Sequence, residues 1–224
     1  MIKLEHTETF NWEGAIRGMR NPMNSWEMSD SGRCEEDYCY DKCPYKDKDY
    51  CKKIEHGELV VGKNDLDLMK RLAKAGSDHR KFMRQIFVSV DITAPLYWWK
   101  EFDTYKVGTV ANSCSTMHTI HNEEFTLDDF SHEKLSVGRY LHFVQYISLL
   151  NEVREEYLAT NDKVVWYEMI QLLPSSYNQK RTVTMNYENL VNMYHARKNH
   201  KLTEWLEFCD WIKTLPYAED LICG

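Results

Sequence analysis

Apolar residues recur at helical spacing along much of the chain. Between residues 137 and 158 they follow one another at steps of three or four positions, which predicts a long amphipathic helix. We expect its buried stripe to be Leu141, Val144, Ile147, Leu150 and Val153. The same spacing, with capping and helix-breaking residues, predicts further helices over residues 12–19, 64–76, 95–106, 161–173, 186–197 and 202–215. Asn64 is the expected N-cap of the second of these helices.

Apolar and polar residues alternate instead between residues 86 and 92, and a period of two is typical of a strand. We predict a strand over 79–92, a short edge strand over 1–8 and another strand over 181–185. Strands mixed with long helices, without an internal repeat or a Gly/Ser linker, indicate one α+β domain over residues 1–224. We expect a mixed sheet flanked by long helices.

Residues 21–63 are the exception to this patterning, because they are highly charged and lack either period. A loop this long in a compact domain needs either a function or a cross-link, such as a bound metal or disulfides. Four of the seven cysteines, with spacing C-x4-C-x3-C-x7-C, fall here: Cys34, Cys39, Cys43 and Cys51. In a cytosolic chain such a cluster is more often a metal site than a disulfide framework. We predict a Cys-rich insertion at about 30–55 that binds zinc through these thiolates; free or partly oxidised thiols and an iron–sulfur cluster are the alternatives.

Composition narrows the function classes. Hydrophobic residues make up 43% of the 224 residues, enough to build a packed core. The formal charge of −7 argues against general nucleic-acid binding, since phosphate dominates that affinity, but a local basic pocket for a small anion is compatible with it. The chain shows neither a signal peptide nor a run of about 18 apolar residues. We expect a cytoplasmic protein without a membrane span.

Common catalytic and phosphate-binding motifs are absent from the sequence, including the P-loop, G-x-G-x-x-G, H-E-x-x-H and G-x-S-x-G patterns. His118 and His121 are three residues apart and could form a ligand pair, but spacing places no third ligand. A polar pocket or surface is the other interpretation of this pair.

One ordered series of residues along the chain gives a more specific indication of function. Asp78 and His79 precede Phe82 at the head of the predicted strand 79–92. The rest of the series is Asn112-x-x-Ser115 after a helix, Leu173–Pro174 before a threonine-rich segment, and Asn186 eleven residues ahead of Arg197. In this order the series resembles the flavin-dependent thymidylate synthases, whose signature is R-H-R-x-x-S-x-N-x-x-S-x-R-Y.

The chain departs from that signature at its arginines. Tyr105, Lys106 and Val107 replace the R-H-R triplet, and Met117 and His118 replace the closing Arg-Tyr. The first serine becomes a valine. Arginine offers a fork of donors that binds phosphate in a bidentate way, which lysine cannot reproduce. Each lost charged hydrogen bond costs roughly 1.5–3 kcal/mol, or about 10- to 150-fold in affinity.

The resemblance implies a methyltransferase of nucleotide biosynthesis that converts dUMP to dTMP with FAD, NADPH and methylenetetrahydrofolate, and that assembles as a homotetramer. It implies that Ser115 acts on the pyrimidine as catalytic and substrate-binding residue, and that Arg197 binds the nucleotide. His79, Asn112 and Asn186 would contact the flavin. The structural alternatives are a helix cap for Asn186, a helix C-terminal charge for Arg197, turn formation for Asn112 and Ser115, and a structural histidine at His79.

Two other functions compete with this one. The loss of the arginines favours a catalytically inactive member of the fold that binds a nucleotide or a protein partner. A flavoenzyme that modifies an unusual pyrimidine is the third possibility.

Overall fold

The computed structural model describes residues 2–34, 57 and 59–224. The chain forms two compact units, each drawn from three stretches of the sequence. Unit 1 comprises Met1–Thr7, Ser89–Thr184 and Arg197–Trp211. Unit 2 comprises Glu8–Val88, Met185–Ala196 and Ile212–Gly224. The organisation as a single domain stays a prediction.

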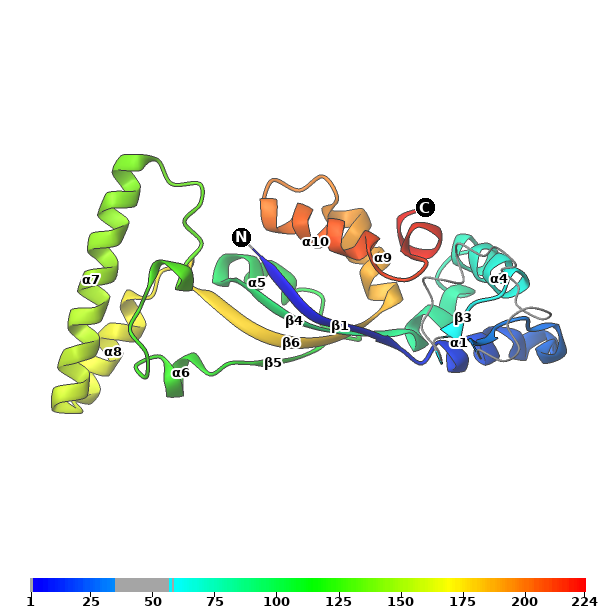
Figure 1. Cartoon of the computed structure of the whole chain (residues 1–224), viewed down its shortest axis with the longest axis horizontal. Coiled ribbons are helices and arrows are strands. Elements are labelled where there is room, and N and C mark those ends of the chain that lie inside the picture. Colours follow the sequence, from blue (N-terminus) through cyan, green and yellow to red (C-terminus); the bar gives the residue numbers. More distant parts are fainter. Residues whose placement is uncertain (1, 35–56, 58) are drawn as a thin grey trace. The chain divides into compact units, whose positions relative to one another are not determined.

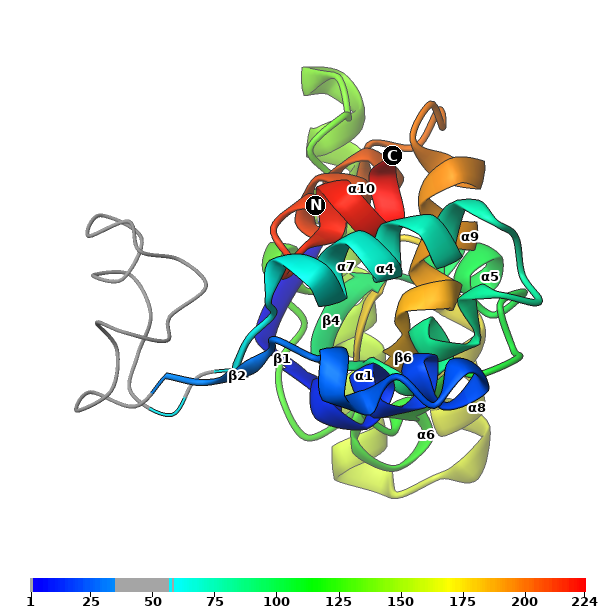
Figure 2. The same ribbon diagram turned by 90° about the vertical axis from the view of Figure 1, so that its right-hand side faces the viewer.

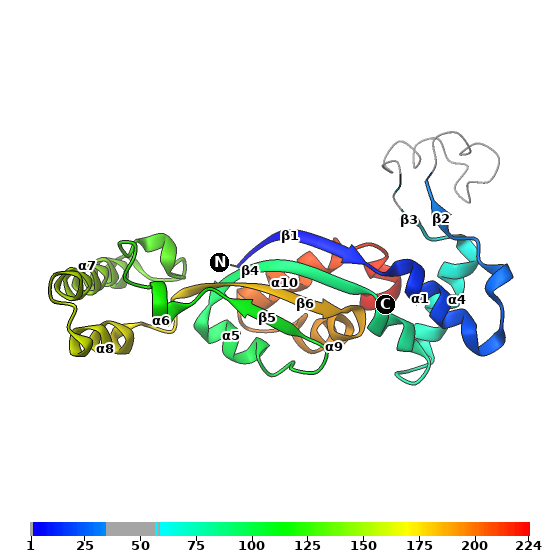
Figure 3. The same ribbon diagram turned by 90° about the horizontal axis from the view of Figure 1, so that it is seen from below.

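A four-stranded sheet with the order β1-β4-β6-β5 contributes residues to both units (Figure 3). Its strands are β1 (Lys3–Phe10), β4 (Phe87–Pro95), β6 (Asn178–Asn186) and β5 (Val110–Ser113). β1 lies at an edge, which confirms the edge-strand prediction. In β4 the alternation has the predicted result, because Val88, Val90 and Ile92 are completely buried while Ser89 and Asp91 are half-buried on the other face.

The strand predicted from residue 79 begins only at Phe87, and Arg80–Gln85 form the 3-10 helix η3. The prediction of a strand over 79–86 is therefore wrong. The helical turn lets Arg80 and Arg84 both bind the carboxylate of Glu188, Arg80 at 3.1 Å. Along an extended strand the same two residues would be about 13 Å apart, so the helical turn brings their side chains closer together.

The core of unit 1 is built from aromatic residues of α5 (Leu96–Phe102) and α10 (Thr203–Lys213). Pro95 is the N-cap of α5, one residue before the helix rather than its first residue as predicted, and the helix ends at Phe102 instead of residue 106. The rings of Trp98 and Trp205 lie 4.8 Å apart, and both side chains are fully buried. α5 and α10 lie on the same side of the strands (Figure 1), so this aromatic cluster covers one face of the sheet.

A second apolar cluster of unit 1 is formed around α7 (Val137–Thr160) and α8 (Lys163–Leu172), which lie side by side (Figures 1 and 3). Its buried members are Ile120, Phe125, Phe130, Ile147, Leu150 and Met169. Ile147 and Leu150 confirm part of the predicted stripe. Leu141 and Val144 were predicted to be buried and are 58% and 38% exposed, so the prediction is wrong for the first half of α7.

The connection from β5 to α7 contains α6 (Thr116–Thr119) and the 3-10 helix η4 (Leu127–Asp129). In unit 2, α1 (Trp12–Arg20) and α4 (Lys63–Lys74) both pack against η3, and Figure 2 shows the two helices near each other. The 3-10 helices η1 (Asn21–Met23) and η2 (Trp26–Met28) follow α1. The C-terminal part of the chain contributes α9 (Tyr187–Arg197), whose last residue belongs to unit 1, and the π-helix η5 (Glu219–Cys223).

A buried ion pair joins α1 to α4. Arg20 Nε lies 2.6 Å from Asp65 Oδ1, and the two side chains are 4% and 0% exposed. The other oxygen of Asp65 accepts hydrogen bonds from the hydroxyls of Ser29 and Ser31. This network satisfies both charges, as burial of an ion pair requires.

The predicted N-cap of α4 is wrong by two residues, because the helix begins at Lys63 and Gly62 takes the cap position. The carboxylate of Asp30, which is distant in sequence, accepts from the backbone N–H groups of Asn64 and Asp65 at 2.9 and 3.1 Å. A carboxylate supplied by another segment therefore replaces the local cap.

The stem of the Cys-rich insertion is a pair of antiparallel strands, β2 (Gly32–Arg33) and β3 (Leu59–Val60). Next to it, the N–H of Gly57 donates to the carbonyl of Cys34 at 2.8 Å. Cys34 is half-buried, whereas Cys39, Cys43 and Cys51 lie outside the described residues. The zinc site formed by these four cysteines stays a prediction.

Candidate functional site

Arg197, at the end of α9, is held by three side chains of unit 1. Its Nε donates to the hydroxyl of Tyr105 at 3.0 Å and its Nη1 to Glu101 Oε2 at 2.8 Å. Its guanidinium lies 4.7 Å from the ring centre of Trp205, in cation–π contact. The side chain is 19% exposed. Two of its five N–H donors are used in these hydrogen bonds, so the group is oriented and keeps donors for an anion.

Glu101, on α5, organises this arrangement. Its Oε2 also accepts from Trp205 Nε1 at 2.8 Å and lies 3.4 Å from His200 Nε2. One carboxylate oxygen thus connects the end of α9 with α5 and α10. Glu101, Tyr105 and Trp205 could not be predicted as partners of Arg197, because no local pattern in the sequence relates them to it.

Asn112 lies on the edge strand β5, opposite Thr182 of β6, and its side chain is exposed. Thr182 donates to Asp91 Oδ1 at 2.6 Å, and Lys180 forms an ion pair with Asp91 at 3.0 Å. Hydrogen bonds from Thr182 and Lys180 lower the pKa of Asp91. Asn112 therefore belongs to a polar face of the sheet.

That polar face is the one turned away from α5. Arg181, the neighbour of Thr182, stacks on Trp99 of α5 with its guanidinium 4.1 Å from the ring centre. Successive side chains of a strand point to opposite faces, so Thr182 and Asn112 point away from α5. Arg197 binds Glu101 of α5. Within one chain, the structure does not bring Asn112 and Arg197 together.

Ser115 follows β5 and is the N-cap of α6. Its Oγ accepts from the N–H of His118 at 3.2 Å, which accounts for one role of this hydroxyl. Beside α6 is a pocket of about 350 Å³, lined by Met117, His118, His121, Tyr157, Asn161, Lys163 and Trp166. The histidine pair thus lines a pocket.

The chemistry of this pocket suits an anion. Its lining residues include a lysine and two histidines but no carboxylate. The ring of His121 packs edge-on against Tyr157 at 5.0 Å, and its Nδ1 is buried without a hydrogen-bond partner among the residues that the structure describes. Among the described residues, no three His, Cys, Asp or Glu side chains are grouped as metal ligands, so the histidine pair has no third ligand there.

The other two predicted site residues, Asn186 and His79, belong to unit 2. Asn186 Oδ1 accepts from the N–H of Asn189 at 3.0 Å, and Asn189 Oδ1 accepts from the N–H of Asn186 at 3.1 Å. This reciprocal pair caps the start of α9, as the helix-cap alternative expects. His79 precedes η3 and is exposed. Its ring makes no hydrogen bond with the part of the chain that the structure describes.

No protein-family model and no curated protein sequence matches the chain. Its structure is similar to that of thymidylate synthase X from Helicobacter pylori, solved with FAD and dUMP, with a TM-score of 0.67 and 14% identity over 99% of this chain and 96% of that one. The chain has the fold of a flavin-dependent thymidylate synthase.

A second structure of the Helicobacter pylori flavin-dependent enzyme, also complexed with FAD and dUMP, gives a TM-score of 0.66 at 15% identity, covering 99% of this chain and 97% of that one. The predicted α+β class and the family resemblance of the fold are thereby confirmed. Within the described residues, no helix has the length and apolar character needed to cross a bilayer.

Proposed function

We propose that the protein is a flavin- and pyrimidine-nucleotide-binding enzyme that methylates dUMP, or a related nucleotide, at the pyrimidine. The observation that carries this proposal is the fold, which extends over 99% of the chain and is shared with an enzyme solved with FAD and dUMP. The proposed cofactor is FAD, with NADPH and methylenetetrahydrofolate as co-substrates. FAD, when bound and reduced, supplies the hydride, so the protein supplies position and electrostatics.

The proposed roles of the residues follow from the family resemblance, and the surroundings of Arg197 support its role. Arg197, oriented by Glu101 and stacked on Trp205, binds the nucleotide phosphate through its remaining donors. Ser115 orients the pyrimidine. Asn112, exposed on β5, contacts the flavin, as do His79 and Asn186.

The pocket beside α6 supplies positive charge close to Ser115. Lys163, His118 and His121 line it, and a carboxylate is absent from its lining. Lys163 compensates in part for the missing signature arginines, because it places a cation in the pocket beside α6, the helix that Ser115 caps. It does not reproduce the bidentate geometry of arginine.

We further propose that the protein is a homo-oligomer, a tetramer, with sites shared between copies. Asn112 and Arg197 lie on opposite sides of the sheet in one chain, so one cavity that contains both needs residues from two copies. The first half of α7 offers a surface for such assembly. Val137, Leu141 and Val144 are 80%, 58% and 38% exposed and follow each other at steps of four and three residues on one side of the helix.

The test is the thermal stabilisation of the protein by dUMP. We expect dUMP to raise the Tm, and Arg197→Ala to remove most of that shift, because the variant loses a charged hydrogen bond to phosphate. Arg181→Ala is a matched control: Arg181 also stacks on a tryptophan, pairs with an acidic residue and is 16% exposed. A dUMP shift of the same size in Arg197→Ala and Arg181→Ala would contradict the role of Arg197.

A second candidate is a catalytically inactive nucleotide- or protein-binding module with this fold. The ion pair between Arg197 and Glu101 favours it, because the charge that would attract a phosphate is already neutralised within the chain. Formation of dTMP from dUMP by the purified protein supplied with FAD, NADPH and methylenetetrahydrofolate distinguishes the two. The enzyme forms dTMP, whereas the module binds without turnover.

A further inference from the structure

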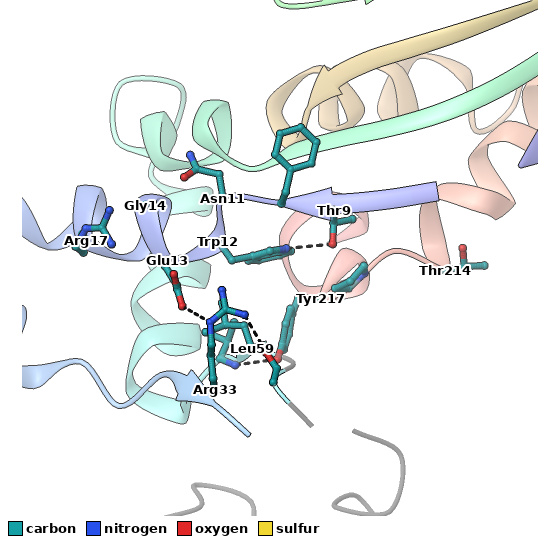
Figure 4. Close-up of a pocket in the computed structure, with 14 residues that line it drawn as sticks. Thr9, Asn11, Trp12, Glu13, Gly14, Arg17, Arg33, Leu59, Thr214 and Tyr217 are labelled. Atoms are coloured by element: carbon teal, nitrogen blue, oxygen red, sulfur yellow. Dashed lines mark hydrogen bonds and ion pairs between the residues drawn. The ribbon is translucent and has the colours of Figure 1, made fainter. Parts of the chain in front are cut away.

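Unit 2 contains a pocket of about 660 Å³ that none of the proposed roles uses (Figure 4). Three segments that are distant in sequence form it. They are the corner from β1 into α1, the stem of the Cys-rich insertion and residues 214–217. Small-molecule sites typically have volumes of about 300–1,000 Å³. The pocket therefore has room for a ligand of mononucleotide size.

Two arginines line this pocket. Arg33, on β2, has its guanidinium fixed by Glu13 at 2.9 Å and by the carbonyl of Gly57 at 2.9 Å. Two of its five N–H donors are used, so three remain for a ligand. Glu13 and Arg33 are drawn joined in Figure 4. The contact makes Arg33 a preorganised donor.

Arg17 supplies the charge that this ion pair does not neutralise. It lies one turn after Glu13 on α1, a spacing at which the two could pair. Glu13 binds Arg33 instead, and Arg17 is exposed and forms no ion pair or hydrogen bond with the described residues. With two arginines and one glutamate, the charged lining carries one net positive charge in a chain whose net charge is −7.

Aromatic and aliphatic side chains complete the lining. The ring of Phe10 is 43% exposed and is stacked on Phe87 at 5.5 Å. Trp12 meets Tyr217 edge-on at 5.5 Å and donates from Nε1 to Thr9 at 3.2 Å. Leu59 adds aliphatic surface. A lining that mixes aromatic rings with polar groups and two arginines suits a planar ring that carries an anionic group.

We propose that this pocket is a second ligand site, which binds a mononucleotide with its phosphate at Arg17 and Arg33 and its base against Phe10. Arginine is the side chain best suited to phosphate, because its donors form a planar fork. None of the residues proposed for the dUMP site lines this pocket; Arg33 and Leu59 come from the stem of the insertion, and Gly57 lies next to it. The two sites are therefore separable by mutation.

Calorimetric titration of the full chain with AMP tests the proposal. The titrated protein carries the substitution Arg197→Ala, so that AMP binding at the proposed dUMP site is weakened and does not mask binding at the second site. We expect one AMP per chain, with adenosine and inorganic phosphate each binding at least tenfold more weakly than AMP. Adding Arg17→Ala or Arg33→Ala should weaken AMP binding by about tenfold or more.

Arg71→Ala is the matched control, since Arg71 is an exposed arginine of unit 2 that pairs with Asp67 and lies outside the pocket. It should leave AMP binding unchanged. Arg17→Ala removes no hydrogen bond or ion pair among the described residues, so its folding should be intact even if Arg33→Ala disturbs the stem. Absence of AMP binding, or equal affinity in Arg17→Ala and Arg71→Ala, overturns the proposal. Neither outcome bears on the dUMP shift of the wild-type chain.

Discussion

Asp65 is the single residue on which the structure of unit 2 depends most clearly. It is completely buried, and its two oxygens accept from Arg20, Ser29 and Ser31. Its position in the sequence, in the first turn of a predicted helix, indicated only a favourable interaction with the helix dipole. Burial with a charged partner makes its contribution much larger.

Asp65→Ala should lower the free energy of unfolding by about 3–5 kcal/mol, because it leaves the Arg20 guanidinium buried without its partner. Urea unfolding at neutral pH measures this loss. Asp67→Ala is the control on the same helix, because Asp67 is 67% exposed and forms an ion pair with Arg71 at the protein surface. Its effect should stay within about 0.5 kcal/mol. Similar losses for the two variants would contradict the role assigned to the buried pair.

The pKa of Asp65 also affects how the stability of the protein depends on pH. Burial alone would raise the pKa of Asp65, but hydrogen bonds from Ser31, Ser29 and Arg20 outweigh it and hold the pKa below its ordinary value. A lowered folded pKa means that the stabilisation is complete above the unfolded pKa of about 3.9 and is lost as the pH falls through the folded value.

Unfolding experiments below about pH 5 should therefore show a steeper loss of stability in the wild-type protein than in Asp65→Asn, which cannot titrate at this position. The comparison uses the slope of the free energy of unfolding against pH, so the lower overall stability of the variant does not affect it. Parallel slopes for the two proteins would show that Asp65 does not contribute.

At the scale of elements, the long helix α7 is the clearest difference between pattern and structure. Its predicted stripe is buried at Ile147 and Leu150 but exposed at Leu141 and Val144. An apolar period shows which side of a helix avoids water, and it cannot show whether the covering surface comes from the same chain. We interpret the exposed half as the surface that another copy covers.

Leu141→Asp should therefore shift the protein from oligomer to monomer in analytical ultracentrifugation, since a carboxylate would be buried without a partner in the interface. His142→Asp is the matched control, because His142 is exposed on the same turn and points in another direction. The assignment of this surface is contradicted if both variants sediment like the wild-type protein, or if both dissociate equally.

Elements with a clear period could be predicted well, whereas contacts between distant segments could not. The strand around Val90 follows from spacing, and the helices with Trp98 and Met69 follow from spacing together with capping and helix-breaking residues. η3 escaped prediction because the contacts of Arg80 and Arg84 with Glu188, about a hundred residues away, could not be inferred from the local pattern. The cap of α4 escaped because Asp30 supplies it from another segment.

At the candidate site, too, the local sequence pattern could be interpreted but the contacts between distant segments could not be predicted. The order of His79, Asn112, Asn186 and Arg197 along the chain was enough to suggest the fold, which the structural comparison confirms. The partners of Arg197 could not be predicted, since Glu101 and Trp205 approach it only after α5 and α10 pack together. The functional roles of the predicted site residues stay proposals.

At the scale of the whole molecule, a fold shared at 14% identity requires that the core be rebuilt from different residues of suitable size. Here the unit 1 core is aromatic, with Trp98, Trp99, Phe102, Trp205 and Phe208 at most 2% exposed. Glu101 and Trp205, which hold Arg197, belong to the same two helices as this core. Packing of the core and orientation of Arg197 are therefore coupled.

Flavin binding tests the central claim most directly, because the proposed chemistry depends on bound FAD. The purified full-length chain is incubated with FAD, separated from unbound FAD by gel filtration, and examined for the visible absorption of flavin. We expect a yellow protein fraction that holds about one FAD per chain. Unfolding the protein should then release this FAD, so that the flavin absorption moves to the fraction of free FAD. A colourless protein fraction, with all FAD eluting later, would contradict the account.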